Sequence, residues 1–243
     1  TPDLVGHSFG GESPELMDIY VNLNRSVARL MRELEARFGK QSVLYAVSSD
    51  HGVQTLPEVL LSRGIQLGKL DKDAIMTAAE GALRARFGEG QWIEAISTSE
   101  VYLRAATLDR YKATRGDVAL VLNDALTKIG GIRGVLSEAD FTNAKTPEIG
   151  LFARGHDPQR SGDLKILTHA GWLWGNYVAA NHGTAFDEDT RIPIIFSGWN
   201  IARGKEINRE VFADDVAPTL LGVLGHAAPT WMTGRSLARD LSL

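Results

Sequence analysis

Carboxylate and imidazole side chains occur at three places along the sequence and could together bind metal ions. Asp3 and His7 lie four residues apart, Asp50 and His51 are adjacent, and His182 lies far downstream. Oxygen and nitrogen ligands of these types suit zinc, and the chain has no cysteine to build a closed thiolate site. Five candidate ligands exceed what one tetrahedral ion with an open position uses, so two metal ions fit the set better.

The surroundings of the first pair favour a loop. Pro2, Gly6 and two further glycines flank the pair, and these residues are typical of turns. We therefore expect Asp3 and His7 to lie in a loop rather than on one face of a helix. A carboxylate and an imidazole at this spacing also occur often by chance.

The second and third groups lie where ligand-bearing loops are expected. Asp50 and His51 follow a short apolar run, and Gly52 helps the backbone to turn so that both side chains can face one ligand. A solvated surface turn is the alternative. His182 precedes Gly183 and Thr184, small or polar neighbours that are more typical of a site than of a core, although a lone histidine is usually structural.

Helices and strands must hold these groups in place. Ser13, Pro14 and Glu15 predict the start of a helix that ends before Gly39 and buries one apolar face. A short apolar run over 42–48 predicts a buried strand. Further helices are expected over 71–87, 115–129 and 214–224, and further strands over 92–96, 101–104, 132–136, 164–168 and 192–197. Residues 146–162 are expected to be irregular.

These elements predict an α/β fold in which a largely parallel sheet is flanked by helices and carries an inserted α+β subdomain. The catalytic core is expected over residues 1–68 and 161–243, and the inserted cap subdomain over 69–160. Strands 164–168 and 192–197 are expected to resume the core sheet. The ligands should then gather at the carboxyl ends of core strands.

Composition excludes several classes of function. The chain has 243 residues and a net charge of −4, and no dense run of Lys and Arg predicts nucleic-acid binding. No stretch approaches the roughly 20 apolar residues that cross a bilayer. The first residues lack a Met, a basic region and an apolar signal core, so we expect that any targeting segment has been removed or lies upstream. The compartment is therefore not readable directly.

The order and context of the motifs resemble the alkaline phosphatase superfamily. The closest resemblance is to bacterial secreted alkaline phosphatases with a threonine nucleophile, whose catalytic domain is similar to type I phosphodiesterases and nucleotide pyrophosphatases. The matching segments are TPDLVGHSFGGESPE at 1–15, SSDHGV at 48–53, ANHGTAFDEDTRIPIIFSGW at 180–199 and DDVAPTLLGVLG at 214–225. The insertion resembles the family in position alone.

The resemblance implies a role for each candidate ligand. Asp3, His7 and His182 would bind one zinc ion, and Asp50 and His51 would bind the other. In the family a further aspartate and the nucleophilic Thr or Ser come from a region that would precede Thr1. We therefore expect this chain to be a C-terminal portion that is inactive by itself and needs an N-terminal segment of the same protein.

The implied activity is zinc-dependent hydrolysis of phosphate monoesters through a covalent phosphoenzyme, in the periplasm or outside the cell. The substrate would be a phosphorylated small molecule. A phosphodiesterase or nucleotide pyrophosphatase is the alternative, and a cofactor-independent phosphoglycerate mutase fits the motifs less well. A metal-binding module without catalysis is the hypothesis from another class.

The remaining candidates have simpler interpretations. His156 and His226 are expected to be solvated, and His169 is a weak candidate for lining the cleft. Lys165 and Arg191 could meet substrate phosphate, but surface or structural pairing is commoner for such residues.

Overall fold

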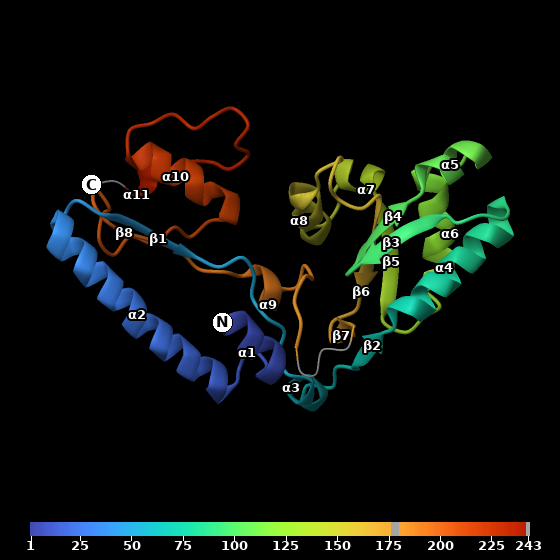
Figure 1. The fold of residues 1–243 in the computed structure, drawn as a ribbon, viewed down its shortest axis with the longest axis horizontal. Coiled ribbons are helices and arrows are strands. Elements are labelled where there is room, and N and C mark those ends of the chain that lie inside the picture. The colour runs from blue at the N-terminus through green and yellow to red at the C-terminus, as the bar shows by residue number, and fades with distance from the viewer. Residues whose placement is uncertain (176–179, 242–243) are drawn as a thin grey trace. The chain divides into compact units, whose positions relative to one another are not determined.

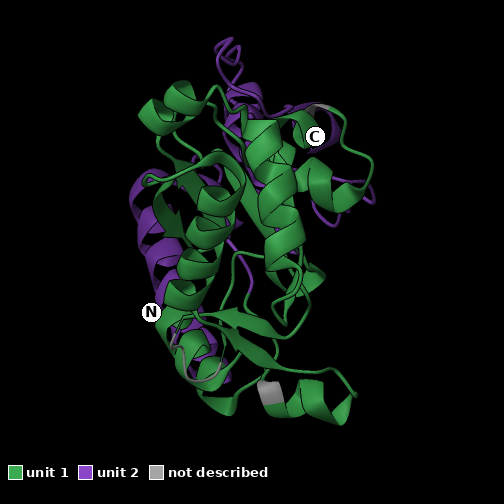
Figure 2. Cartoon of the chain, turned by 90° about the vertical axis from the view of Figure 1, so that its right-hand side faces the viewer, with its two compact units in different colours: residues 1–16, 53–190 green, residues 17–52, 191–243 purple. Residues whose placement is uncertain are grey.

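The computed structural model describes residues 1–175 and 180–241. The chain divides into two compact units, coloured separately in Figure 2. Unit 1 comprises residues 1–16 and 53–190, and unit 2 comprises residues 17–52 and 191–243. Each unit has a hydrophobic core of its own.

Unit 1 contains a mixed set of helices and strands (Figure 1). They are α1 (Pro2–Phe9), α3 (Pro57–Ser62), β2 (Gly68–Leu70), α4 (Lys72–Phe87), β3 (Ile93–Ser97), β4 (Glu100–Leu103), α5 (Ala105–Tyr111), α6 (Arg115–Leu126), β5 (Ile132–Ser137), α7 (Glu138–Thr142), α8 (Pro147–Gly155), β6 (Leu164–Thr168), β7 (Trp172–Trp174) and α9 (Asp187–Thr190). Four strands form an antiparallel sheet in the order β3-β4-β6-β5, and β2 pairs with β7 in parallel.

Helices α4 and α6 pack together on one face of the four-stranded sheet (Figure 1). Helix α4 begins where the sequence predicts, because Asp71 accepts hydrogen bonds from the backbone N–H groups of the first turn. Leu83, Trp92 and Leu122 are fully buried between the helices and the sheet. The predicted strand pair is confirmed as β3 and β4.

A buried carboxylate joins α4 to the edge strand of this sheet. Glu80 is 7% exposed, and its Oε1 accepts hydrogen bonds from the backbone N–H groups of Trp92 at 2.9 Å and Ile93 at 2.8 Å. Its Oε2 accepts a hydrogen bond from Arg84 at 3.0 Å. Because both carboxylate oxygens of Glu80 accept hydrogen bonds, the side chain can remain buried beside the start of β3.

The strand over 164–168 differs from its expected place. Strand β6 pairs with β4 and β5 in unit 1. The strand over 194–198 instead pairs with the strand over 44–48, and both of these belong to unit 2. The expectation that both resume one core sheet is wrong for β6. A short apolar run predicts a strand but does not identify its partner, because partner choice depends on long-range packing. The expected domain boundaries stay a prediction.

Unit 2 is built around a two-stranded antiparallel sheet. Its elements are α2 (Pro14–Phe38, of which 17–38 belong to unit 2), β1 (Leu44–Ser48), β8 (Ile194–Gly198), the 3-10 turn η1 (Ala213–Asp215), α10 (Val216–Val223) and α11 (Ala238–Leu241). Leu44 and Phe196 pack on one side of the β1–β8 sheet with a core that includes Val223 and Leu237. Residues 242–243 of the predicted second core segment lie outside the described residues.

Helix α2 begins and ends as predicted but does not bury a face. Ser13 Oγ accepts a hydrogen bond from the N–H of Leu16 at 3.1 Å, and Gly39 ends the helix with φ of 94°. Leu16 is the buried residue of this helix, while Leu23 and Leu30 are 44% and 54% exposed. The expected buried face is therefore wrong within the described residues, where much of the apolar side of the helix remains exposed.

The α/β class is confirmed, but the strand directions differ from those expected. Among the described strands, β2–β7 is parallel and the other pairs are antiparallel. Apolar runs of this length occur in both kinds of sheet when both faces are covered, so the sequence does not determine the direction. Within the described residues, no helix combines the length and apolar character needed to cross a membrane.

Glu80→Ala should destabilise unit 1 by about 2–3 kcal/mol, because two buried backbone N–H groups lose their acceptor. Urea denaturation followed by tryptophan fluorescence measures the change. Glu94→Ala is the matched control, since Glu94 is an exposed residue of β3 and should change stability little. Equal unfolding midpoints for the two variants would contradict the role given to Glu80.

Candidate metal centre

Asp3 and His7 lie on helix α1 and not in a loop, which corrects the expectation from the sequence. Thr1 caps the helix by accepting a hydrogen bond from the N–H of Leu4 at 3.4 Å, and Pro2 occupies the first turn, where proline is favourable. Because the two ligands are four residues apart on a helix, their side chains project from the same face.

Gly6, which suggested a loop, lies inside the helix. It is buried, and a Cβ at this position would lie 3.4 Å from a methyl group of Val53, which is an ordinary van der Waals contact. A single glycine is tolerated inside a helix at a cost of about 1 kcal/mol relative to alanine. Its presence therefore weakens the helical pattern of the sequence without preventing the helix.

The segment containing His182 lies alongside α1 through a pair of hydrogen bonds. The N–H of Ala180 donates to the carbonyl of His7 at 3.3 Å, and His7 Nδ1 lies 3.0 Å from the carbonyl of Ala180. Ala180 is fully buried, so the contact is protected from water. These bonds bring together residues that are 173 positions apart in the sequence.

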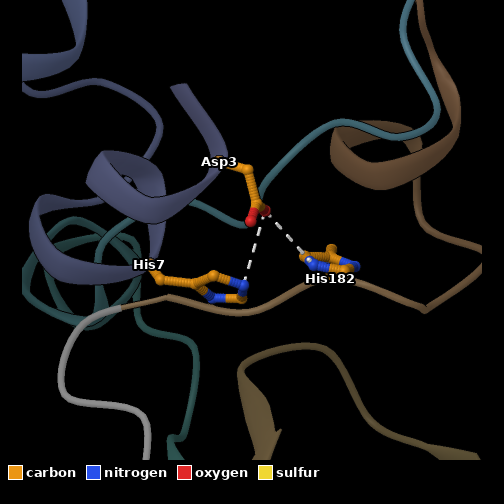
Figure 3. Close-up of side chains that lie close together, drawn as sticks. All are labelled: Asp3, His7 and His182. Carbon is orange, nitrogen blue, oxygen red and sulfur yellow. Dashed lines mark ion pairs between the residues drawn. The ribbon is translucent and has the colours of Figure 1, made fainter. Parts of the chain in front are cut away.

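Three of the five predicted ligands meet at this contact (Figure 3). Asp3 Oδ1 lies 3.4 Å from His7 Nε2 and 3.5 Å from His182 Nε2. The imidazole rings have centroids 4.9 Å apart, and the potential ligand atoms all lie within 4.8 Å of one another. All three residues belong to unit 1.

The two carboxylate–imidazole spacings fit a zinc ion. Bonds of about 2.0–2.2 Å in a tetrahedron place neighbouring ligand atoms about 3.3–3.6 Å apart. Both carboxylate–imidazole distances fall in this range and exceed the usual length of a direct hydrogen bond. One oxygen and two nitrogen ligands also leave a fourth position open, as in catalytic zinc sites.

The hydrogen bond of His7 determines which ring nitrogen can bind metal. The carbonyl of Ala180 is an acceptor, so His7 Nδ1 must carry the proton and donate it. Nε2 then keeps its lone pair directed toward Asp3. A backbone carbonyl that fixes the tautomer of a ligand histidine is the usual support for such a ligand.

Asp50 and His51 belong to unit 2 and form a similar pair. His51 Nδ1 lies 2.7 Å from the carbonyl of Gly52, and its Nε2 lies 3.7 Å from Asp50 Oδ2. A hydrogen bond from its own backbone and the charge of His51 lower the pKa of Asp50 below its ordinary value. Asp50 is thus an exposed carboxylate that stays ionised, beside an imidazole nitrogen that can accept a metal.

The loop after His182 contains a support that the sequence analysis missed. Asp189 is 4% exposed, and its Oδ2 accepts hydrogen bonds from the N–H and hydroxyl of Thr184 at 2.8 and 2.5 Å. The hydroxyl of Thr184 in turn accepts a hydrogen bond from the N–H of Phe186. The buried carboxylate of Asp189 therefore holds the loop that follows His182. The run Asp-Glu-Asp at 187–189 is the feature of the sequence that could have indicated this support.

The other candidates differ in their surroundings. His226 and His169 are exposed, whereas His156 is half-buried with its ring centroid 5.0 Å from that of Phe141, so its predicted solvation is wrong. The ammonium of Lys165 lies over the ring of Phe152 and 3.9 Å from Glu100. Burial lowers the pKa of Lys165, partly offset by Glu100. Arg191 belongs to unit 2.

Comparison with known proteins places these motifs in a family. The family model described as type I phosphodiesterase / nucleotide pyrophosphatase matches residues 1–186. The alkaline phosphatase PafA of Elizabethkingia meningoseptica is 28% identical over 238 residues, which are 97% of this chain and 43% of that protein. A Myroides odoratus protein named calcium-transporting ATPase is 25% identical over 236 residues, which are 96% of this chain and 43% of that protein.

A solved structure agrees with these sequence matches. The crystal structure of wild-type PafA superposes with a TM-score of 0.86 at 27% identity, covering 99% of this chain and 46% of that one. The predicted resemblance to the alkaline phosphatase superfamily and the alkaline-phosphatase-like fold are confirmed. The chain spans less than half the length of both curated relatives.

We expect His182→Ala to weaken zinc binding by about 10–100-fold or more, because one of three ligands of an open site is lost. Competition with a fluorescent chelator measures the affinity. His226→Ala is the matched control, since His226 is an exposed histidine of the other unit. Equal zinc affinity in wild type and His182→Ala would remove the residue from the ligand set.

Proposed function

The chain belongs to the type I phosphodiesterase / nucleotide pyrophosphatase family, and on this premise we propose that it forms part of a zinc-dependent phosphate-ester hydrolase. Asp3, His7 and His182 would hold one zinc ion. The observation that carries the proposal is a single carboxylate oxygen of Asp3 facing the Nε2 atoms of two histidines at 3.4 and 3.5 Å. This arrangement fits tetrahedral zinc with a position open for substrate.

A second zinc ion would be held by Asp50 and His51 together with ligands from elsewhere. The support is the shared geometry of the pairs: in each, a backbone carbonyl contacts Nδ1 and leaves Nε2 beside a carboxylate. A bound zinc ion supplies charge that activates a hydroxyl nucleophile and stabilises the oxygens of an in-line displacement.

The residues of this chain set the charge at the first site. Neutral imidazoles leave Asp3 as the single anionic ligand of the three, so the loaded site keeps a net positive charge. Such a site would attract a phosphate group. Because Asp3 and His7 lie on α1 and His182 lies on a loop held against it, these side chains would hold the ion in place without rearrangement during the reaction.

Phosphate monoesters are the substrates that we propose, with diesters or nucleotide pyrophosphates as the alternative. The name of the relative PafA, an alkaline phosphatase, supports monoesters, and the family description supports the alternative. In the proposed reaction a hydroxyl attacks phosphorus, the alcohol leaves with a proton, and water then hydrolyses the phosphoenzyme.

We propose that the Thr or Ser nucleophile and a further aspartate come from a segment outside residues 1–243. The relatives are more than twice as long as the stretch that this chain matches. Unit 2 also exposes paired apolar residues of its sheet, Val47 at 48% and Ile195 at 55%, and two strands alone are marginally stable. Additional chain packed on this sheet and on α2 would bury these side chains.

A periplasmic or extracellular location fits this assignment. The absence of cysteine is compatible with an oxidising compartment.

In the longer protein, His182→Ala and His51→Ala should each lower kcat/KM for p-nitrophenyl phosphate by at least about 100-fold. His226→Ala should leave the rate unchanged. The same assay with bis-p-nitrophenyl phosphate separates the two substrate classes, since a faster diester reaction would favour the alternative. Zinc binding without turnover of either ester would indicate a metal-binding module without catalysis.

We propose that the four-stranded sheet and its helices select the substrate and do not contribute metal ligands. None of the five candidate ligands lies between residues 71 and 168. Replacing these residues by a short linker between β2 and β7 should change the ratio of rates on small and bulky monoesters. Zinc should still bind, although more weakly than in wild type, because the replacement also removes the core on which Trp174 packs. A folded replacement that no longer binds zinc would refute this division of roles.

A further inference from the structure

Asn181 precedes the ligand His182 and is buried, with 7% of its surface exposed. Its side-chain amide uses both of its ends. Oδ1 accepts a hydrogen bond from the N–H of His182 at 2.9 Å, and Nδ2 donates to the carbonyl of Trp174 at 3.2 Å. The amide thus connects the end of β7 to the backbone of a metal ligand.

The backbone of Asn181 makes a third connection. Its carbonyl accepts a hydrogen bond from the N–H of Gln54 at 3.0 Å. Gln54 is itself buried and directly follows Val53, the residue that packs on Gly6 of α1. Asn181 is therefore held by β7 on one side and by the segment packed on α1 on the other.

The residue before Asn181 extends the effect to the other histidine. The N–H of Ala180 donates a hydrogen bond to the carbonyl of His7, and the carbonyl of Ala180 accepts one from His7 Nδ1. A shift of the backbone at Asn181 would move this carbonyl and the backbone of His182 together. The Nε2 atoms of both imidazoles would then no longer face Asp3 Oδ1.

We propose that Asn181 is the positioning residue of the metal centre, which fixes both histidine ligands through its side-chain amide. This inference rests on the proposed zinc site. Asparagine suits the position because one end must donate and the other must accept. An aspartate would place a carboxylate against the Trp174 carbonyl, and alanine would leave both backbone groups without these partners. Supports of this kind change metal affinity without contacting the metal.

The test measures zinc affinity by chelator competition in wild type, Asn181→Ala, Asn181→Ser and Asn123→Ala, with the unfolding midpoint of each. We expect Asn181→Ala to weaken zinc binding about 10–100-fold and Asn181→Ser, whose hydroxyl can still accept locally, to weaken it less. Asn123 is the matched control, because its Oδ1 accepts from the backbone N–H of Val135 at 3.1 Å, in the same unit but with no link to the ligands. Its alanine variant should lose stability and keep wild-type affinity.

Cobalt spectra give a second readout that a merely structural role would not change. The visible bands of bound Co²⁺ should shift in both Asn181 variants and stay unchanged in Asn123→Ala, because they report ligand geometry. Wild-type affinity and spectra in a folded Asn181→Ala variant would overturn the proposal. If that variant does not fold, unchanged affinity and spectra in Asn181→Ser would overturn it instead. Absence of zinc binding by wild type would instead refute the proposed function.

Discussion

The hydrogen bond between His7 Nδ1 and the carbonyl of Ala180 is the interaction on which the proposed metal centre depends. It joins helix α1 to a segment 173 residues later, and it also fixes the proton on the nitrogen that faces away from Asp3. Without it, His7 could present either nitrogen, and one of the bonds that align the His182 segment with α1 would be lost. The carbonyl of Ala180 thus sets the tautomer of His7 and helps to align the His182 segment with α1.

Support for this contact runs back to the hydrophobic core. Trp174 at the end of β7 is part of the buried cluster beneath the four-stranded sheet, and its carbonyl holds the side chain of Asn181. Its neighbour Trp172 packs so closely on Gly68 and Gly131 that a Cβ at either glycine would overlap the indole ring. Because the core is close-packed, it can hold the ligand loop rigidly. Core packing is therefore linked to the imidazole of His182 through one amide.

The sequence identified the ligand types but not all of the elements that carry them. The cap at Ser13 and the glycine after α2 were readable because such signals are local. Pro2 and Gly6 were misread, since proline is favourable in a first helical turn and a single glycine is tolerated inside a helix. The partners of β6 could not be read, because its apolar run fits any covered sheet. Asn181 was visible in the motif, but its role depends on a carbonyl seven residues away.

The exposure of the candidate ligands bears on how a substrate would reach the proposed first site. Asp3 has a side chain that is 50% exposed, against 15% for His7 and 28% for His182, so the carboxylate side of the cluster is the more accessible one within the described residues. A divalent ion bound by one anionic ligand would keep a net positive charge and would attract a phosphate monoester dianion more strongly than a diester monoanion. On the proposed ligand set, charge alone would therefore favour monoesters. A diesterase built on the same ligands would need additional contacts to the second ester group, and those contacts would have to come from residues outside the Asp3, His7 and His182 set.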